Sequence, residues 1–134
     1  MSRIRDKANK LIMQELSQNG IEGIVPSHGD IMVQLFRGGE LTMKEIAEKI
    51  HRSKPTVTVL IEKLIAYGYV QKSKSPTDSR VTFIRLTPQG QELEPLFQRI
   101  SSKLNARVYA GMSSADAVGL ETALTLIERN LERI

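Results

Sequence analysis

Residues 41–90 read LTMKEIAEKIHRSKPTVTVLIEKLIAYGYVQKSKSPTDSRVTFIRLTPQG, and this stretch decides the fold. Thr42 and Glu45 have the spacing of a capping box, in which each side chain accepts the backbone N–H of the other residue. A helix is therefore predicted to begin at Thr42, with apolar residues following at helical spacing. Ser53 is a good N-cap for a second helix, and Pro55 falls in its first turn, where the missing N–H costs nothing. Two helices so close together predict a helix-turn-helix.

The second helix has one apolar side and one mixed side. At about 100° per residue, the apolar side carries Val57, Leu60, Ile61, Leu64 and Ile65, which are predicted to be buried. Short hydroxyls on the mixed side reach base edges or phosphates, lysines reach phosphates, and an exposed Val or Pro can touch a thymine methyl group. The alternative is an ordinary solvated face, and Glu62 also lies on this side. The candidate DNA contacts are Ser53, Lys54, Pro55, Thr56, Thr58, Val59 and Lys63.

A hairpin of the length of a wing follows the second helix. Residues 69–74 and 81–86 alternate as strands, and residues 75–80 have turn chemistry. Lys72 and Lys74 on the first strand are further candidate DNA contacts, as are Asp78 and Arg80 at the tip. A carboxylate two residues from a guanidinium can hold it extended, and an extended Arg fits the narrow, negative minor groove of A·T-rich DNA. The alternative is a weak surface ion pair.

The ordered set of these residues resembles the MarR (multiple antibiotic resistance regulator) family of winged-helix repressors. This resemblance covers nearly the whole chain and implies a repressor of nearby genes that binds double-stranded DNA. It also implies release by a small-molecule effector bound between the dimer helices and the DNA lobe. Apolar stripes at both ends of the chain predict a homodimer, whose two-fold axis predicts near-palindromic operators. Val59 departs from the family, where many members have Arg or another polar residue. The matching segments are Leu41-Thr42, Glu45-Ile46-Ala47, Ser53, Thr56-Val57-Thr58, Lys63-Leu64, Gly68-Tyr69-Val70, Pro76-Thr77-Asp78-Ser79-Arg80 and Leu86-Thr87-Pro88-Gln89-Gly90.

The composition agrees with a basic, globular DNA-binding protein. The chain has 134 residues, of which 40% are hydrophobic and 25% charged, which is ordinary for one domain. Residues 42–90 hold nine Lys and Arg against four Asp and Glu, whereas the two flanking regions are close to balanced, so the net charge of +4 lies in the predicted DNA lobe. There is no cysteine, no signal pattern and no apolar run of about 18 residues. We therefore expect a cytoplasmic protein without a membrane partner.

The regions before residue 42 are predicted to form two helices and a short strand. A first amphipathic helix runs to Gln18, with an apolar stripe that needs a partner to cover it. Ser27, after Pro26, is predicted to cap a second helix. Residues 40–41 are expected to pair as a third strand of the wing sheet. The inward residues are predicted to be Ile4, Ala8, Leu11, Ile12 and Leu16 in the first helix, and Ile31, Met32, Leu35 and Phe36 in the second.

After the wing, Thr87 is predicted to cap a long helix that runs to about Tyr109 and bends at Pro95. Ser113 and Asp116 repeat the capping pattern for a last helix. The apolar residues of this last helix are spaced as in a helix that packs against a partner helix, and we call this stripe the seam. The alternative is that the chain's own first helix covers the stripe. The region of Phe97, Ile100 and Leu104 is expected to join this dimer surface. The stripe of the last helix consists of Leu120, Leu124, Ile127, Leu131 and Ile134.

The predicted fold class is mainly α with a small antiparallel wing (α+β), a winged helix-turn-helix with dimerisation helices at both ends. Residues 1–134 are expected to form a single MarR-like domain. Within it, residues 20–90 are the DNA-binding lobe, and residues 1–19 and 91–134 are the dimerisation helices.

Nothing in the sequence has the pattern of a catalytic site. The two histidines, His28 and His51, lie in neither a metal-ligand nor a nucleophile–base spacing, and there is no glycine-rich phosphate loop. We predict no enzymatic activity, no cofactor and no metal. His28, near Asp30, is a candidate effector contact, although a histidine at a helix start more often caps or hydrogen-bonds. A winged-helix module for protein or RNA contact remains the alternative function, but 4% aromatic residues leave little for RNA bases to stack on.

Overall fold

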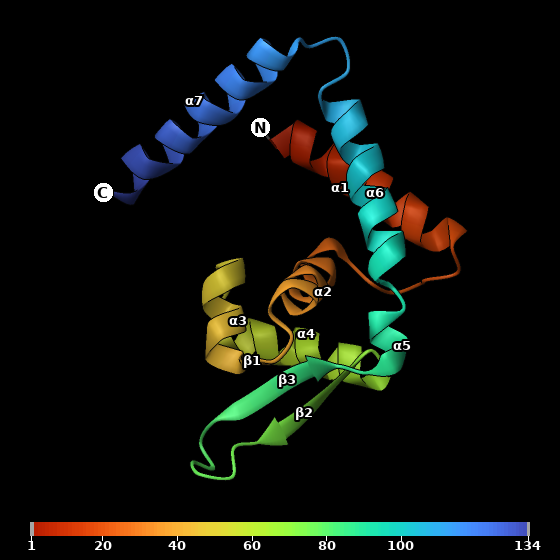
Figure 1. The fold of residues 1–134 in the computed structure, drawn as a ribbon, viewed down its shortest axis with the longest axis vertical. Helices are drawn as coiled ribbons and strands as arrows, with labels where there is room; N and C mark the ends of the chain where they lie inside the picture. The colour runs from red at the N-terminus through yellow and green to blue at the C-terminus, as the bar shows by residue number, and fades with distance from the viewer. Residues whose placement is uncertain (1, 134) are drawn as a thin grey trace. The chain divides into compact units, whose positions relative to one another are not determined.

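The computed structural model describes residues 2–133, with the side chains of residues 3–133, and Figure 1 shows its elements. The chain divides into two compact units, Met1–Ser101 and Ser102–Ile134, with the boundary inside α6. The predicted class, mainly α with a small antiparallel wing, is confirmed. In chain order the elements are α1 (Ser2–Gln18), α2 (Pro26–Gly38), β1 (Leu41–Thr42), α3 (Met43–Ile50), α4 (Lys54–Ala66), β2 (Val70–Lys74), β3 (Thr82–Leu86), α5 (Pro88–Gln91), α6 (Glu94–Val108) and α7 (Ser114–Glu132).

The helix-turn-helix forms from local capping, as predicted. The Glu45 N–H donates to Thr42 Oγ1 at 3.1 Å, and the Thr42 N–H donates to Glu45 Oε1 at 3.0 Å, so the capping box begins α3. His51 ends α3 in the left-handed conformation, with φ of 56°. Ser53 Oγ then accepts the Thr56 N–H at 3.3 Å and begins α4. Both helix starts and the turn between them therefore agree with the sequence.

The core of the first unit lies among α2, α3, α4 and the sheet. The predicted apolar side of α4 is inward: three of its residues are fully buried, and Leu60 and Ile65 are half-buried against the same core. Burying each aliphatic side chain contributes about 1.5–3 kcal/mol, so the core determines which side of α4 faces solvent. The most deeply buried side chains are Ile31, Met32, Leu35, Ile46, Val57, Ile61, Leu64, Val70 and Ile84.

The sheet has the strand order β1-β3-β2, and all pairs are antiparallel. The third strand is Leu41–Thr42, one residue later than predicted. The first wing strand was expected to alternate, but only Val70 of β2 is buried. The reason is that β2 is an edge strand whose far end extends beyond the core. Lys72, opposite Ile84 in the register, shares the core-facing side of the sheet without being buried.

The predicted cap of the second helix is wrong. The helix α2 begins at Pro26, and Val25, not Ser27, occupies the N-cap position. Proline is favoured as the first helical residue, which places the cap immediately before it. The Val25 N–H donates to Nδ1 of His28 at 3.0 Å, so His28 acts as the third helical residue of a capping box, the position where Glu or Gln is usual.

The region after the wing is two helices, not one bent helix. Thr87 caps α5 as predicted, because its Oγ1 accepts the Gly90 N–H at 3.0 Å. The helix stops at Gln91 and a second helix begins at Glu94. Pro95 has no N–H to donate to the carbonyl of Gln91, so the helical hydrogen-bond series is interrupted there.

The expectation that Ile100 forms part of the dimer surface is wrong, whereas the same expectation for the partly buried Phe97 and Leu104 stays a prediction. Phe97 contacts Phe36 edge-on, with ring centroids 5.5 Å apart, and Ile100 is buried in the core of the first unit. In α1, Leu16 is buried, whereas Ile4 is 65% exposed. The chain therefore covers much of this apolar surface by itself.

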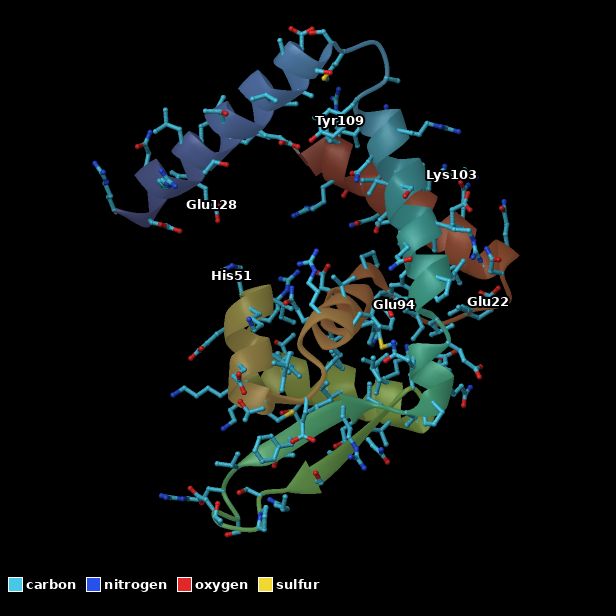
Figure 2. The ribbon with its side chains drawn as sticks, viewed as in Figure 1. Glu22, His51, Glu94, Lys103, Tyr109 and Glu128 are labelled. Atoms are coloured by element: carbon cyan, nitrogen blue, oxygen red, sulfur yellow. The ribbon has the colours of Figure 1, made fainter. Side chains whose placement is uncertain are left out.

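The second unit contains the end of α6 and all of α7. The predicted capping box is confirmed: the Asp116 N–H donates to Ser113 Oγ at 3.1 Å, and the Ser113 N–H donates to Asp116 Oδ2 at 3.3 Å. Tyr109, labelled in Figure 2, donates its hydroxyl to Glu121 Oε1 at 2.5 Å and so joins the two helices. In the described part of the chain, no helix is both long and apolar enough to cross a membrane.

The predicted stripe of α7 is exposed. Its four described members, Leu120, Leu124, Ile127 and Leu131, have exposed fractions between 38% and 60%. Ile134, the fifth predicted member, lies outside the described residues.

Candidate nucleic-acid interface

A groove runs between α4, the start of α3 and the β2–β3 hairpin. Five of its lining residues carry a positive charge and one carries a negative charge, so the groove is strongly basic. Such a surface attracts phosphates and raises their local concentration. The lining residues are Thr42, Met43, Lys44, Lys54, Thr58, Glu62, Lys72, Ser73, Lys74, Arg80, Val81 and Thr82.

Two regular patterns place these side chains in one groove. Lys54, Thr58 and Glu62 follow one another at four-residue spacing, so they form one stripe along α4. On the hairpin, Lys72 and Lys74 lie on the same side of β2 as the buried Val70. The core that packs α4 against the sheet therefore also brings the stripe of α4 opposite the two lysines.

The predicted reading face of α4 separates into two surfaces. Of the predicted DNA contacts, Lys54, Thr58, Lys72, Lys74 and Arg80 line the groove. The other α4 candidates are exposed on the adjoining outward side, where Val59 is 70% exposed. The residues that do not line the groove are Ser53, Pro55, Thr56, Val59, Lys63 and Asp78.

The two threonine hydroxyls of α4 differ in whether they can donate a hydrogen bond to DNA. Ser53 Oγ donates to Thr56 Oγ1 at 2.9 Å, so the Thr56 hydroxyl keeps its own proton to donate outward. Thr58 Oγ1 donates to the Lys54 carbonyl at 3.0 Å and presents only acceptor lone pairs. A phosphate oxygen accepts hydrogen bonds, so Thr56 can bind one and Thr58 cannot without breaking its bond in the helix.

The wing tip holds the predicted pair of Asp78 and Arg80. Asp78 Oδ1 accepts Nε of Arg80 at 3.1 Å and the Arg80 backbone N–H at 3.0 Å, and Oδ2 accepts Nη2 at 3.3 Å. These bonds from Arg80 hold the pKa of Asp78 below its ordinary value. The Arg80 side chain is 89% exposed, so the guanidinium is held in place while facing solvent. Its insertion into a minor groove stays a prediction.

Two of the charged residues that line the groove were missed as site residues. Glu62 Oε1 accepts Nζ of Lys72 at 2.6 Å across the groove, a contact between residues ten apart in the chain. Lys44 lies at the start of α3, next to Thr42, which pairs with Phe83 on β3. Lys44 could have been predicted as a site residue, because the expected third strand at residues 40–41 already placed the start of α3 beside the wing.

His28 is buried, with 3% of its surface exposed, and caps α2 through Nδ1. Burial, and then the positive charge of Lys63, lower the pKa of His28 from its ordinary 6.5. The capping role named as its alternative is thus present, and its contact with an effector stays a prediction. Figure 2 shows His51 at the end of α3, away from the hairpin. Among the described residues, no three His, Cys, Asp or Glu side chains are grouped to hold a metal ion.

A helix-turn-helix followed by a basic two-stranded wing defines the class of winged-helix DNA-binding proteins. Residues 24–82 match the model of the MarR family. Similar relatives include the regulator YdgJ of Bacillus subtilis (strain 168), 24% identical over 112 residues that cover 84% of this chain and 68% of YdgJ. The repressor IacR of Pseudomonas putida is 28% identical over 100 residues that cover 75% of this chain and 60% of IacR.

The fold is shared with solved structures of the family. The S. aureus MepR–DNA complex superimposes with a TM-score of 0.86 at 22% identity, over 96% of this chain and 93% of that chain. The chain therefore shares the winged-helix fold of MarR-family transcriptional regulators, and its helix-turn-helix lies within the stretch that matches the family model.

Proposed function

We propose that the chain is a homodimeric, sequence-specific repressor that binds near-palindromic operators close to its own gene. The observation that carries this proposal is the groove beside α4, with five cationic side chains and one carboxylate. Lysines there supply phosphate contacts, and the exposed side of α4 supplies base contacts in the major groove. The proposed DNA contacts are Ser53, Lys54, Pro55, Thr56, Thr58, Val59, Lys63, Lys72, Lys74, Asp78 and Arg80.

We infer a dimer because a single reading helix contacts too few base pairs for specific binding. A helix of 13 residues such as α4 reads only a few base pairs, and specific binding normally needs two readings about 34–36 Å apart. The exposed stripe of α7 supports association with a second copy. Self-association through one patch generates a two-fold axis, which presents the two α4 helices as an inverted pair.

Repression and its release rest on the family. IacR is named a repressor, and the same role is proposed for this chain. An effector would lower DNA affinity only if it bound one arrangement of the two reading helices better than the other. The cleft proposed for it is lined by α1, α2 and α5, with His28 as the candidate polar contact. Thermal-shift screening of phenolic acids, with and without operator, tests this; no ligand that prefers either form would refute it.

A gel-shift titration against the DNA that flanks its own gene tests the DNA-binding proposal. We expect binding to one short, near-palindromic segment that is at least about a thousandfold tighter than binding to unrelated duplex of the same length at physiological salt. Equal affinity for every duplex would refute sequence-specific regulation and leave a winged-helix module for protein or RNA contact. Expression of the flanking genes in a deletion strain then separates repression, where transcripts rise, from activation, where they fall.

A further inference from the structure

One carboxylate lines the groove, and it already forms an ion pair with a lysine. Glu62 is the single acidic residue among those that line the groove in the described part of the chain. It is the third member of the stripe that begins with Lys54 and Thr58 on α4. Its Oε1 lies 2.6 Å from Nζ of Lys72 on β2, and about half of each side chain is exposed. The ion pair therefore bridges the reading helix and the wing.

The Glu62 carboxylate occupies the position that a phosphate oxygen would take on Lys72. A carboxylate and a phosphate are both anionic oxygen acceptors, and an ammonium binds either one through the same short, charge-assisted hydrogen bond. Lys72 has three N–H donors, but its single charge is already balanced by Glu62, so a phosphate gains the full attraction of Lys72 only when Glu62 moves away. Because solvent-exposed ion pairs are weak, this exchange is feasible at ordinary DNA concentrations.

We propose that Glu62 is an internal competitor of phosphate that limits the affinity of the groove for DNA of any sequence. This inference rests on the proposed function, since it concerns DNA binding by the same groove. Phosphate contacts supply nearly all of non-specific binding, so an occupied Lys72 weakens binding where base contacts are absent.

Four variants test this competition: Glu62→Gln, Lys72→Met, the double variant, and Glu48→Gln as a matched control. Glu48 is exposed on α3 and does not line the groove, so its replacement removes one charge without changing the pair. Binding to a random-sequence duplex and to the flanking operator is measured between about 50 and about 200 mM salt. Thermal unfolding of each variant checks that the fold is retained.

Glu62→Gln should bind both duplexes about two- to fivefold tighter than Glu48→Gln, the range expected for loss of one exposed ion pair. Its plot of log affinity against log salt should be steeper by about 0.9, because Lys72 is free to neutralise one more phosphate. Both effects should disappear in the Lys72→Met background.

Three results would overturn the inference. If Glu62→Gln behaves like Glu48→Gln, the pair does not limit binding. If Glu62→Gln binds tighter to the same extent with Lys72→Met, general repulsion and not competition for Lys72 is responsible. If Glu62→Gln binds the operator more weakly, the carboxylate contacts a base. A parent that binds no duplex refutes the proposed function together with this inference, whereas the three results above leave the proposed function standing.

Discussion

Gly90 lies directly against the backbone of Tyr69: a Cβ atom added to Gly90 would come within 2.0 Å of the Tyr69 carbonyl oxygen. The same carbonyl accepts the Thr87 N–H at 3.0 Å. Thr87 Oγ1 in turn donates to the Gly68 carbonyl at 2.5 Å and accepts the Gly90 N–H at 3.0 Å. The start of α5 is thus fixed to the turn between α4 and β2, which closes the base of the wing.

Replacement of Gly90 by alanine should therefore destabilise the protein. The new methyl group meets backbone and not a flexible side chain, so the segment must shift, at a cost of about 1–3 kcal/mol. Urea unfolding at a fixed protomer concentration measures this loss. Gly119→Ala is the matched control, because the site is helical and, among the described residues, nothing beyond the adjacent residues and the local helix backbone lies within 4 Å of its added Cβ. It should stabilise the protein by about 0.5–1 kcal/mol. A Gly90→Ala protein as stable as the parent would contradict the close contact.

The pair at the wing tip predicts a dependence on the DNA flanks. Arg80→Ala should weaken binding about tenfold on operators with A·T-rich flanks and less on G·C-rich ones, because a narrow minor groove attracts a guanidinium. Asp78→Ala should cause a smaller loss in the same direction, since it releases Arg80 without removing it. Fluorescence anisotropy with the two sets of flanks provides the comparison. Unchanged binding by Arg80→Ala at moderate salt would show that the wing does not read DNA.

The outward side of α4 predicts two different kinds of loss. Thr56→Ala should relax the preference between operator variants, because its hydroxyl retains a proton for a base or phosphate. Lys63→Ala should weaken all sequences alike and lower the salt slope by about 0.9 if it neutralises one phosphate. Competition gel shifts with single-base operator variants separate the two effects. If both variants keep the sequence preference of the parent, the outward side is an ordinary solvated face.

His28 predicts a loss of stability in mild acid. Its folded-state pKa lies below the ordinary 6.5, chiefly because the ring is buried and secondly because of Lys63, so the unfolded chain binds the proton first. This contribution is fully present above pH 6.5 and is lost as the pH falls from there towards the folded-state pKa. Nδ1 must also stay unprotonated to accept the Val25 N–H.

Urea unfolding at pH 7.5 and at lower pH measures this dependence, and His28→Asn is the control, since its Oδ1 can accept the same N–H without titrating. The variant should lose less stability than the parent over this range. Burial raises the pKa of Asp30 above its ordinary 3.8, so the folded state binds this proton first and the contribution of Asp30 to stability increases as the pH falls, opposite in sign to that of His28. Equal pH dependence in parent and variant would assign the effect to other groups.

Features set by neighbours in the sequence could be predicted. The capping residues Thr42, Ser53 and Ser113 were all placed correctly, because each acts on a backbone N–H three residues away. The buried side of α4 followed from helical periodicity alone. Ser27 was the exception. Serine is favoured at the N-cap and proline at the first helical position, and here the helix begins at Pro26, which makes Val25 the N-cap.

Features set by distant packing could not be predicted in the same way. The contact between Glu62 and Lys72 depends on the strand register and on the rotation of α4 against the sheet, and neither is local. The separation of the α4 candidates into groove and outward side has the same origin. The burial of Ile100 was missed because a stripe at helical spacing looks alike whether its own chain or a second copy covers it.

The last prediction concerns the dimer, and it rests on the seam of α7. Leu120, Leu124, Ile127 and Leu131 repeat at spacings of four, three and four, which aligns them on one side of the helix, and all four are exposed. Val118 and Leu126 are also exposed but lie on other sides of the same helix. The helix therefore offers a matched comparison within one element.

Leu124→Glu with Leu131→Glu places two charges in the seam on each of two copies, and these charges would be desolvated and repel one another in a dimer. We expect this variant to sediment as a monomer at micromolar concentration and to lose specific operator binding, because a single α4 reads too few base pairs. The winged-helix unit should stay folded, since its buried core contains no residue of α7. Val118→Glu with Leu126→Glu adds the same charge off the seam and should remain dimeric and bind. A parent that is itself monomeric and still binds a single half-site tightly would refute the model.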